Sequence, residues 1–230
     1  MTRLRVATYN LHSGVGVDRR FRPSRIIEVI NELHADVVAL QEVLSPVRGF
    51  DVHAQLRSGT GLHLATMTTM PLAGGTFGNG MLSRWPIIEI VEHDLSVARR
   101  EPRGALEVMI GRGEHRLRVI ATHLGLRSAE RSEQLARLLA IVKSAPERPT
   151  VLAGDFNVTR ARARELRAHA AHFGRIDALA TFPSIAPVLA LDRIFAVSGA
   201  SIIDVAVHRS RRARVASDHL PLVATIELAD

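Results

Sequence analysis

The sequence predicts an α/β fold in which two stacked, mixed β-sheets carry helices on their outer faces. Short apolar segments typical of buried strands recur along the chain, whereas few segments have the apolar spacing of a helix. The expected connections give parallel as well as antiparallel strand pairs. With 230 residues, of which 47% are hydrophobic and 23% charged, we expect one domain over residues 1–230 with a large core.

The first 42 residues are predicted to form a strand–helix–strand unit. Residues 5–10 make a strand that stops at Asn10, and residues 36–42 make a buried strand that stops at Glu42. Ser24 suits the N-cap of the helix between them, in which apolar residues follow at helical spacing. A single intervening helix makes the two strands parallel neighbours.

The middle of the chain is predicted to contain few helices. Residues 49–64 are weakly patterned and fit a helix followed by an edge strand, and the glycines of residues 74–80 indicate turns. Strands are expected at residues 87–91, 105–110 and 117–123. The last two form an antiparallel pair around a glycine-rich turn, and the second of them stops at His123.

The C-terminal half centres on the segment 154–157, which follows an apolar strand at residues 149–153. In an extended chain alternate side chains share a face, so Asp155 and Asn157 point one way and Phe156 the other. Around this strand we expect helices at residues 128–143 and 160–172, and strands at residues 189–197, 202–207 and 222–228. The first of these three strands carries Asp192.

The composition favours an anionic partner and excludes two kinds of site. Lys+Arg number 30 against 23 Asp+Glu, a net charge of +7, and Lys143 is the single lysine. Arginine binds phosphate in a bidentate manner, although a genomic preference for arginine codons explains the total equally well. The lack of cysteine excludes disulfides and thiolate metal sites. Since we find no signal-peptide pattern and no apolar run of membrane-helix length, we expect a cytoplasmic protein.

Four clusters of arginines are candidates for a basic rim around a pocket. They are Arg19, Arg20 and Arg22; Arg99, Arg100 and Arg103; Arg160, Arg162, Arg164 and Arg167; and Arg209, Arg211, Arg212 and Arg214. Two of these clusters follow strands that end in polar residues, which places them beside those strand ends. The alternative is that the arginines are scattered over the solvated outer surface.

Polar side chains stand where several predicted strands end. They are Asn10, Glu42, His123, Asp155, Asn157, Asp218 and His219, with Asp192 inside a strand. If these ends meet at one rim of the two sheets, the carboxylates repel one another and raise one another's pKa. A hard divalent cation relieves this repulsion, and oxygen ligands with open water positions fit Mg²⁺ or Mn²⁺ far better than zinc.

Seven short motifs follow one another in the order known from the endonuclease/exonuclease/phosphatase superfamily, which the chain resembles over residues 4–223. The motifs are Tyr9-Asn10-Leu11-His12, Leu40-Gln41-Glu42-Val43, Leu82-Ser83-Arg84, Thr122-His123-Leu124, Gly154-Asp155-Phe156-Asn157, Leu191-Asp192-Arg193-Ile194 and Ser217-Asp218-His219. The overall similarity is to short bacterial members. The resemblance implies a four-layer sandwich of the deoxyribonuclease-like type and Mg²⁺-dependent hydrolysis of phosphoester bonds.

The resemblance also implies roles for individual residues. Glu42 is similar to the principal Mg²⁺ ligand, with Asn10 and Asp218 completing that site. Asp155 resembles the group that orients or deprotonates the attacking water, and whether Asp155 or His219 is the base stays open. The remaining implied groups are Asp192 as the partner of His219, His123 as a second catalytic histidine, and Asn79 and Asn157 as phosphate-binding side chains, to which we add Arg103.

We therefore expect a Mg²⁺-dependent phosphoesterase, and within that class a phosphodiesterase that cleaves nucleic acid or a phospholipid headgroup by in-line water attack. The short chain, its single Trp and single Tyr, and His12 in place of an aspartate weaken an assignment to abasic-site repair. The alternative is a catalytically silent module of the same fold that binds a polyanion. Candidate partners are a phosphodiester or phosphomonoester substrate, nucleic acid and anionic lipid, which no residue of the sequence separates.

Overall fold

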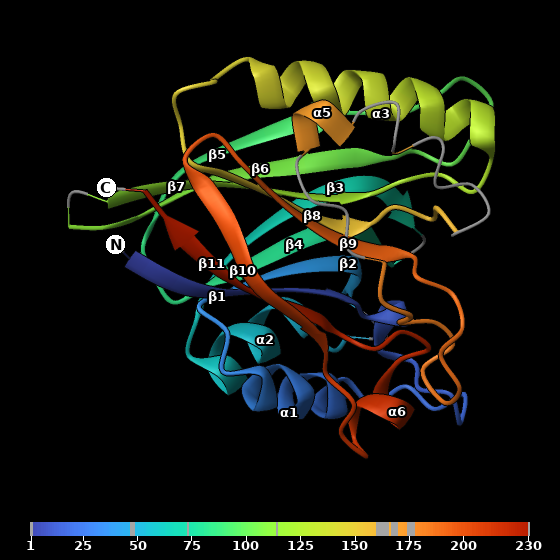
Figure 1. The fold of residues 1–230 in the computed structure, drawn as a ribbon. Coiled ribbons are helices and arrows are strands. Elements are labelled where there is room, and N and C mark those ends of the chain that lie inside the picture. The colour runs from blue at the N-terminus through green and yellow to red at the C-terminus, as the bar shows by residue number, and fades with distance from the viewer. Residues whose placement is uncertain are drawn as a thin grey trace.

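Two stacked β-sheets form the centre of the computed structural model, which describes residues 2–46, 49–72, 74–113, 115–159, 166, 170–173 and 178–229 (Figure 1). The first sheet has the strand order β10-β11-β1-β2-β4-β3, and the second has the order β5-β6-β7-β8-β9. The strands are β1 (Thr2–Asn10), β2 (Val37–Ser45), β3 (His63–Leu72), β4 (Gly75–Ser83), β5 (Ile87–Asp94), β6 (Gly104–Arg112), β7 (His115–His123), β8 (Thr150–Asp155), β9 (Asp192–Val197), β10 (Ala200–Val207) and β11 (Leu222–Leu228).

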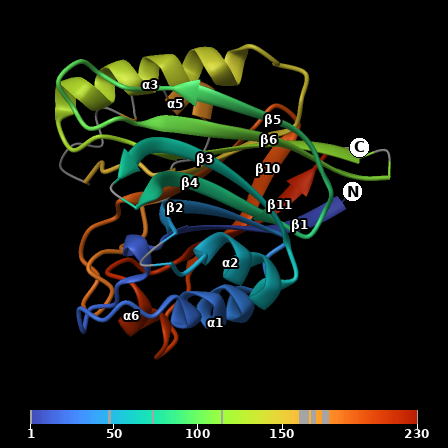
Figure 2. The ribbon, with the colours of Figure 1, turned by 180° about the vertical axis from the view of Figure 1, so that it is seen from behind.

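Helices cover the outer face of each sheet, as predicted. The helices α1 (Pro23–Leu33), α2 (Val52–Thr60) and α6 (Ala213–Ala216) lie on the side of the first sheet, and α3 (Ser128–Lys143) and α5 (Ala170–Phe173) lie on the side of the second (Figures 1 and 2). A short 3-10 helix, η1 (His12–Gly14), follows β1. The molecule therefore has four layers. None of the helices in the described ranges has the length and apolar character needed to cross a membrane.

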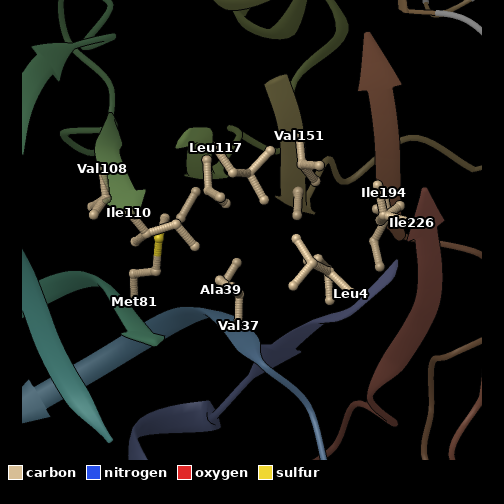
Figure 3. Packing of buried hydrophobic residues seen from close by; sticks show 14 of the residues in the cluster. Leu4, Val37, Ala39, Met81, Val108, Ile110, Leu117, Val151, Ile194 and Ile226 are labelled. Atoms are coloured by element: carbon tan, nitrogen blue, oxygen red, sulfur yellow. The ribbon is translucent and has the colours of Figure 1, made fainter. Parts of the chain in front are cut away.

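Three apolar clusters hold the layers together. The largest lies between the two sheets, where Val37, Met81 and Val108 are among the packed side chains (Figure 3). A second joins the first sheet to α1 and α2, and a third joins the second sheet to α3. Successive residues of one strand serve two clusters, since Ala39 faces the other sheet and Leu40 faces the helices. Strands buried on both faces explain the continuous apolar runs in the sequence.

The strand pairings bring several carboxyl ends to one edge of the molecule. β1 and β2 are parallel, which confirms the predicted strand–helix–strand unit, and β6 and β7 form the predicted antiparallel pair. β7 and β8 are parallel, and β9 runs antiparallel to β8. The ends of β1, β7 and β8 and the start of β9 therefore lie at the same edge, opposite the two chain termini (Figure 1).

Two predicted details of the first sheet and of the helix that covers it are wrong. The glycines at residues 74–80 lie mostly in strand β4, because neighbouring strands approach too closely for side chains. A Cβ atom on Gly78 would lie 1.9 Å from the Met67 carbonyl oxygen. The N-cap of α1 is Arg22, not Ser24, because Pro23 occupies the first helical turn with a suitable fixed φ. Most of the arginine-rich helix expected at residues 160–172 lies outside the described residues.

Candidate active site

Polar side chains from both sheets meet at the edge opposite the chain termini. Asn10 is the last residue of β1, Asp155 is the last of β8, and Asp192 is the first of β9 and not inside that strand as predicted. Asn10 Nδ2 donates a hydrogen bond to Asp155 Oδ2 at 3.1 Å, across the gap between the two sheets. All three side chains are almost completely buried. The structure therefore brings together groups that are far apart in the sequence.

Glu42 reaches this edge through a β-bulge, not through the end of a strand as predicted. β2 continues beyond Glu42, and its pairing with β4 shifts register next to this residue, whose φ is 55°. A bulge of this kind redirects a side chain. Asn10 Nδ2 donates to Glu42 Oε1 at 3.0 Å, while Asn10 Oδ1 accepts from the His12 N–H at 3.0 Å. One amide group thus bridges the carboxylates of Glu42 and Asp155.

His219 forms a buried pair with Asp192. Its Nδ1 lies 2.9 Å from Asp192 Oδ2, and the Thr181 hydroxyl donates to the same oxygen at 2.5 Å. Burial opposes a charge on the imidazole, but Asp192 and the more distant Asp155 and Asp218 outweigh it and raise the pKa of His219 to about 10. The imidazole is therefore protonated at neutral pH, and Nε2, which lies 3.7 Å from Asp155 Oδ2, is a donor.

His123 is the second histidine at this edge, and its charge state is the opposite. Arg103 Nη1 lies 3.1 Å from His123 Nδ1, and His123 Nε2 lies 3.6 Å from Asp155 Oδ2. Burial, together with the positive charges of Arg103 and His219, lowers the pKa of His123 to about 3, against the effect of Asp155. His123 is therefore neutral. Because arginine cannot accept a hydrogen bond, Nδ1 is the acceptor and Nε2 carries the proton.

The segment that follows β8 fixes Asp155 and Asn157. The Asn157 N–H donates to Asp155 Oδ1 at 2.9 Å, and the Asn157 side-chain amide donates to the Leu124 carbonyl at 2.9 Å. Phe156 is buried on the opposite side, where its ring centroid lies 5.2 Å from that of Phe195. The alternation predicted for this segment therefore describes the structure, although the strand itself stops at Asp155 and Asn157 has φ 52°.

An open cavity of about 610 Å³ lies against these groups. Its polar lining consists of Ser13, Glu42, Glu101, Arg103, His123, Asp155, Asn157 and His219, and its apolar lining of Met70, Leu72, Phe77, Leu126, Phe182 and Leu191. Four residues predicted for the site are not part of this lining, and two of them, Asn10 and Asp192, bond to the lining residues Asp155 and His219 from behind it. Asn79 is buried and donates to the Gly104 carbonyl at 2.9 Å, and Asp218 is half-buried with Oδ1 3.9 Å from His12 Nδ1.

The predicted basic rim is not formed by the described arginines. Arg103 is the arginine that lines the cavity, and its Nη1 also lies 3.2 Å from Glu101 Oε1. In the last cluster Arg212 is bound by the carboxylates of Glu28 and Glu32. The exposed Arg19, Arg20 and Arg22 do not line the cavity, and Arg160, Arg162, Arg164 and Arg167 lie outside the described residues. The scattered arrangement therefore describes the three clusters within the described residues better, and the basic rim at Arg160, Arg162, Arg164 and Arg167 stays a prediction.

The carboxylates at this edge suit a cation. Burial raises the pKa of Glu42, and the negative charges of Asp218 and Asp155 add to this effect, while the hydrogen bond from Asn10 opposes it. Among the described atoms, the buried Asp192 Oδ1 finds no hydrogen-bond partner. Asp155, Asp192 and His219 offer ligand atoms within 4.8 Å of one another, a spacing that could hold a metal ion. Oxygen-rich clusters of this kind favour hard divalent cations.

Comparison with known proteins agrees with this architecture. The model of the endonuclease/exonuclease/phosphatase family matches residues 7–219. The chain belongs to this family. One relative in sequence is the uncharacterized protein YbhP of Escherichia coli strain K12. The two proteins are 34% identical over 247 residues, which cover 97% of this chain and 96% of YbhP.

Solved structures of the endonuclease/exonuclease/phosphatase family have the same fold. One from Beutenbergia cavernae has a TM-score of 0.81 at 24% identity, covering 99% of this chain and 72% of that one. D. rerio TDP2 in complex with a single-strand DNA product has a TM-score of 0.74 at 19% identity, covering 99% of this chain and all of that one. The four-layer fold predicted from the sequence motifs is therefore confirmed.

Several residues of this site carry no signal in the sequence. Thr181, which bonds to Asp192, lies in a loop without periodicity. The apolar lining carries no such signal either, because Met70 and Leu72 depend on where strand β3 changes register and Leu126 and Phe182 on loop geometry. The separate methionine, leucine and phenylalanine residues involved have no pattern that distinguishes them from core residues.

Proposed function

We propose that this chain is a divalent-metal-dependent phosphodiesterase in which a water molecule attacks phosphorus in line with the departing oxygen. The observation that carries the proposal is the buried pair of Asp192 and His219, with His219 Nε2 3.7 Å from Asp155 Oδ2 at the wall of an open cavity. A positively charged donor beside a carboxylate suits a reaction in which water loses a proton while an oxygen on phosphorus gains negative charge.

The charge states divide the acid and base roles. His219 already carries a proton at neutral pH, so it is the acid, and Asp155 is the base. Asp155, held by Asn10 and Asn157, takes a proton from the attacking water. The water oxygen forms a bond to phosphorus as the bond to the departing oxygen breaks, and that oxygen receives the Nε2 proton of His219.

In this proposal the neutral imidazole of His123, which Arg103 holds in place, binds the phosphate. The proton on His123 Nε2 is available to a phosphate oxygen, because Arg103 occupies Nδ1. Arg103 is itself buried and fixed, so it holds the imidazole in one orientation. The phosphate would thus meet donors from two histidines whose orientations are set by a carboxylate and by a guanidinium.

Glu42 and Asp218 are the side chains that we expect to hold the cation. A bound Mg²⁺ or Mn²⁺ would neutralise charge on the phosphate. The group of Asp155, Asp192 and His219 is a poorer choice, because a protonated imidazole has no free lone pair for a metal. Asn10 supports the site by bridging two carboxylates, and its direct ligation of the metal stays a prediction because its oxygen accepts from His12.

Nucleic acids and phospholipid headgroups both contain phosphodiester bonds, so the proposed reaction applies to either substrate class. D. rerio TDP2 shares the fold and holds a single-strand DNA product, so nucleic acid is a substrate class to test. A silent module that binds a polyanion receives less support. The acid–base pair is intact, and the described arginines do not surround the cavity.

The test uses the purified protein with bis(p-nitrophenyl) phosphate as the diester and p-nitrophenyl phosphate as the monoester. We expect hydrolysis of the diester with Mg²⁺ or Mn²⁺, its loss in EDTA, and its loss in Asp155→Asn with the fold retained by circular dichroism. A matched control is Asp204→Asn, which changes an exposed aspartate on β10. Inactivity of folded wild-type protein with both metals, or equal activity of Asp155→Asn, would overturn the proposal.

A further inference from the structure

A β-bulge directs apolar side chains of strand β3 toward the cavity. The pairing of β3 with β4 shifts register between Thr68 and Met70. Before the bulge, Met67 faces the core between the sheets. Strict alternation would turn Met70 and Leu72 away from that side, but the extra residue reverses the alternation and returns both to it.

Phe77 completes this apolar surface on the neighbouring strand. It is the cross-strand partner of Met70, and the partner of Met67 is Asn79, two residues along β4 on the same face. Met70, Leu72 and Phe77 all line the cavity. The end of the β3–β4 hairpin therefore presents three apolar side chains to the same space as the carboxylates.

Other segments extend this surface around the cavity. Leu126, in the loop after β7, lines the cavity and is 68% exposed, and Leu72 is 41% exposed. Phe182 and Leu191 line it beside the catalytic pair, since the Phe182 ring centroid lies 5.0 Å from that of His219. We call these six residues the apolar wall: Met70, Leu72, Phe77, Leu126, Phe182 and Leu191.

The position of the apolar wall indicates what covers it. Single exposed leucines are common on protein surfaces, but here two of them share one cavity with Asp155 and His219. Because the apolar wall and the catalytic pair line the same cavity, a single molecule with an apolar group attached to its phosphate can contact both. The cationic side chains that line this cavity among the described residues are both engaged, Arg103 by His123 and Glu101 and the protonated His219 by Asp192.

We propose that the substrate is an amphiphilic phosphodiester, of the phospholipid class, whose apolar chain packs against the apolar wall while its phosphate lies at Asp155 and His219. This inference rests on the proposed function, because the same hydrolysis of the diester bond is assumed. The bond between phosphorus and the departing oxygen breaks, water supplies the new oxygen, and the apolar chain remains on one product.

A pair of chromogenic substrates tests the inference. p-Nitrophenyl methyl phosphate and p-nitrophenyl decyl phosphate have the same leaving group and differ in the length of one alkyl chain, and both are used as monomers below the micelle concentration. Because each methylene removed from water adds to binding, we expect kcat/KM for the decyl ester to exceed that for the methyl ester by about tenfold or more. A single-stranded DNA oligonucleotide is expected to compete poorly with either ester.

Variants of the wall provide the second measurement. In Leu72→Ser/Leu126→Ser we expect the ratio of the two kcat/KM values to fall toward one. Ile203→Ser changes an exposed isoleucine on β10, outside the cavity lining, and keeps the wild-type ratio. A general loss of folding would lower both rates and leave the ratio unchanged.

The outcomes separate this inference from the proposed function. Absence of hydrolysis of any phosphodiester removes the proposed function itself. Equal kcat/KM for the two esters, an unchanged ratio in a Leu72→Ser/Leu126→Ser variant that keeps the wild-type kcat/KM for the methyl ester, or strong competition by the oligonucleotide would overturn the apolar-chain inference while leaving phosphodiester hydrolysis in place.

Discussion

The Nδ1 atom of His219 lies 2.9 Å from Asp192 Oδ2 although the two residues are 27 positions apart and on different segments of the chain. Asp192 accepts a second hydrogen bond from Thr181 at the same oxygen, which fixes the carboxylate. The pair is buried, so its charge–charge interaction is weakly screened by water. This relationship sets the protonation state on which the proposed chemistry depends.

Substitution Asp192→Asn is expected to lower kcat for a phosphodiester about 10²- to 10⁴-fold at pH 7, the range for loss of acid–base catalysis. The pKa of His219, about 10, falls toward its ordinary value of 6.5 once the carboxylate is gone. Since the acid role needs the protonated imidazole, wild-type activity is lost as the pH rises through about 10, and that limb of the profile moves to lower pH in the variant. The measurement is kcat/KM against pH for wild type, Asp192→Asn and the surface control Asp204→Asn. An unmoved alkaline limb would contradict the assignment.

The same pair contributes to stability in a defined pH window. The folded-state pKa of His219 lies above the ordinary value, so its contribution is complete below about pH 6.5 and is lost as the pH rises through about 10. We therefore expect the free energy of unfolding in urea to decline between pH 7 and pH 10 more steeply in wild type than in His219→Gln. Parallel curves for the two proteins would show that this interaction is absent.

His123 gives the opposite pH dependence. Its folded-state pKa of about 3 lies below the ordinary 6.5, so the unfolded chain binds the extra proton first and stability falls as the pH drops below about 6.5. At pH 4.5 the loss attributable to His123 is about 2–3 kcal/mol relative to pH 7. Urea unfolding of His123→Gln should show a shallower decline, and His63→Gln, at an exposed position on β3, should match wild type. If His123→Gln declines as steeply as wild type, the histidine is not buried in its neutral form.

Substitution Glu42→Gln tests the cation site. Removing one carboxylate from a cluster that contains Asp218 and Asp155 lowers metal affinity, and we expect the Mg²⁺ concentration for half-maximal activity to rise about 10- to 100-fold. A second readout without activity is the increase of Tm on adding Mg²⁺, which should shrink in Glu42→Gln and persist in Glu92→Gln, an exposed glutamate on β5. A metal response identical to wild type in Glu42→Gln would place the cation elsewhere.

Substitution Gly78→Ala tests the close approach of strands β3 and β4. The new Cβ would lie 1.9 Å from the Met67 carbonyl oxygen, so backbone must move, and we expect a loss of about 3 kcal/mol or more in the free energy of unfolding. Gly113→Ala is the comparison, because its Cβ meets no atom and only its φ of 61° is unfavourable, at about 1 kcal/mol. Equal losses in urea unfolding would mean that the strands have room for a side chain.

Sequence patterns predict the periodic parts of this fold well. The helix at residues 128–143 coincides with α3, and the parallel relation of β1 and β2 follows from one intervening helix. The patterns fail where contact between neighbouring strands decides whether a side chain fits. The glycines of β4 indicate turns when they are considered alone, and only the neighbouring strand explains why a side chain would not fit.

The candidate site shows the same division. The ordered motifs indicate Glu42, Asp155, Asp192 and His219, because each is a chemically distinctive side chain beside an apolar run. The positions of Thr181 and of the apolar wall depend on loop geometry and on the register shift in β3, which no spacing in a single sequence records. The charge states of the two histidines likewise depend on partners that only the folded chain brings within reach.

The most direct test of the central claim is the rate of p-nitrophenyl methyl phosphate hydrolysis with saturating Mg²⁺ by wild type and by His219→Ala, with each protein shown to be folded. The account predicts a metal-dependent wild-type rate that EDTA abolishes and that falls at least about 10²-fold in His219→Ala. Equal rates for the two proteins, or hydrolysis that persists in EDTA, would contradict it.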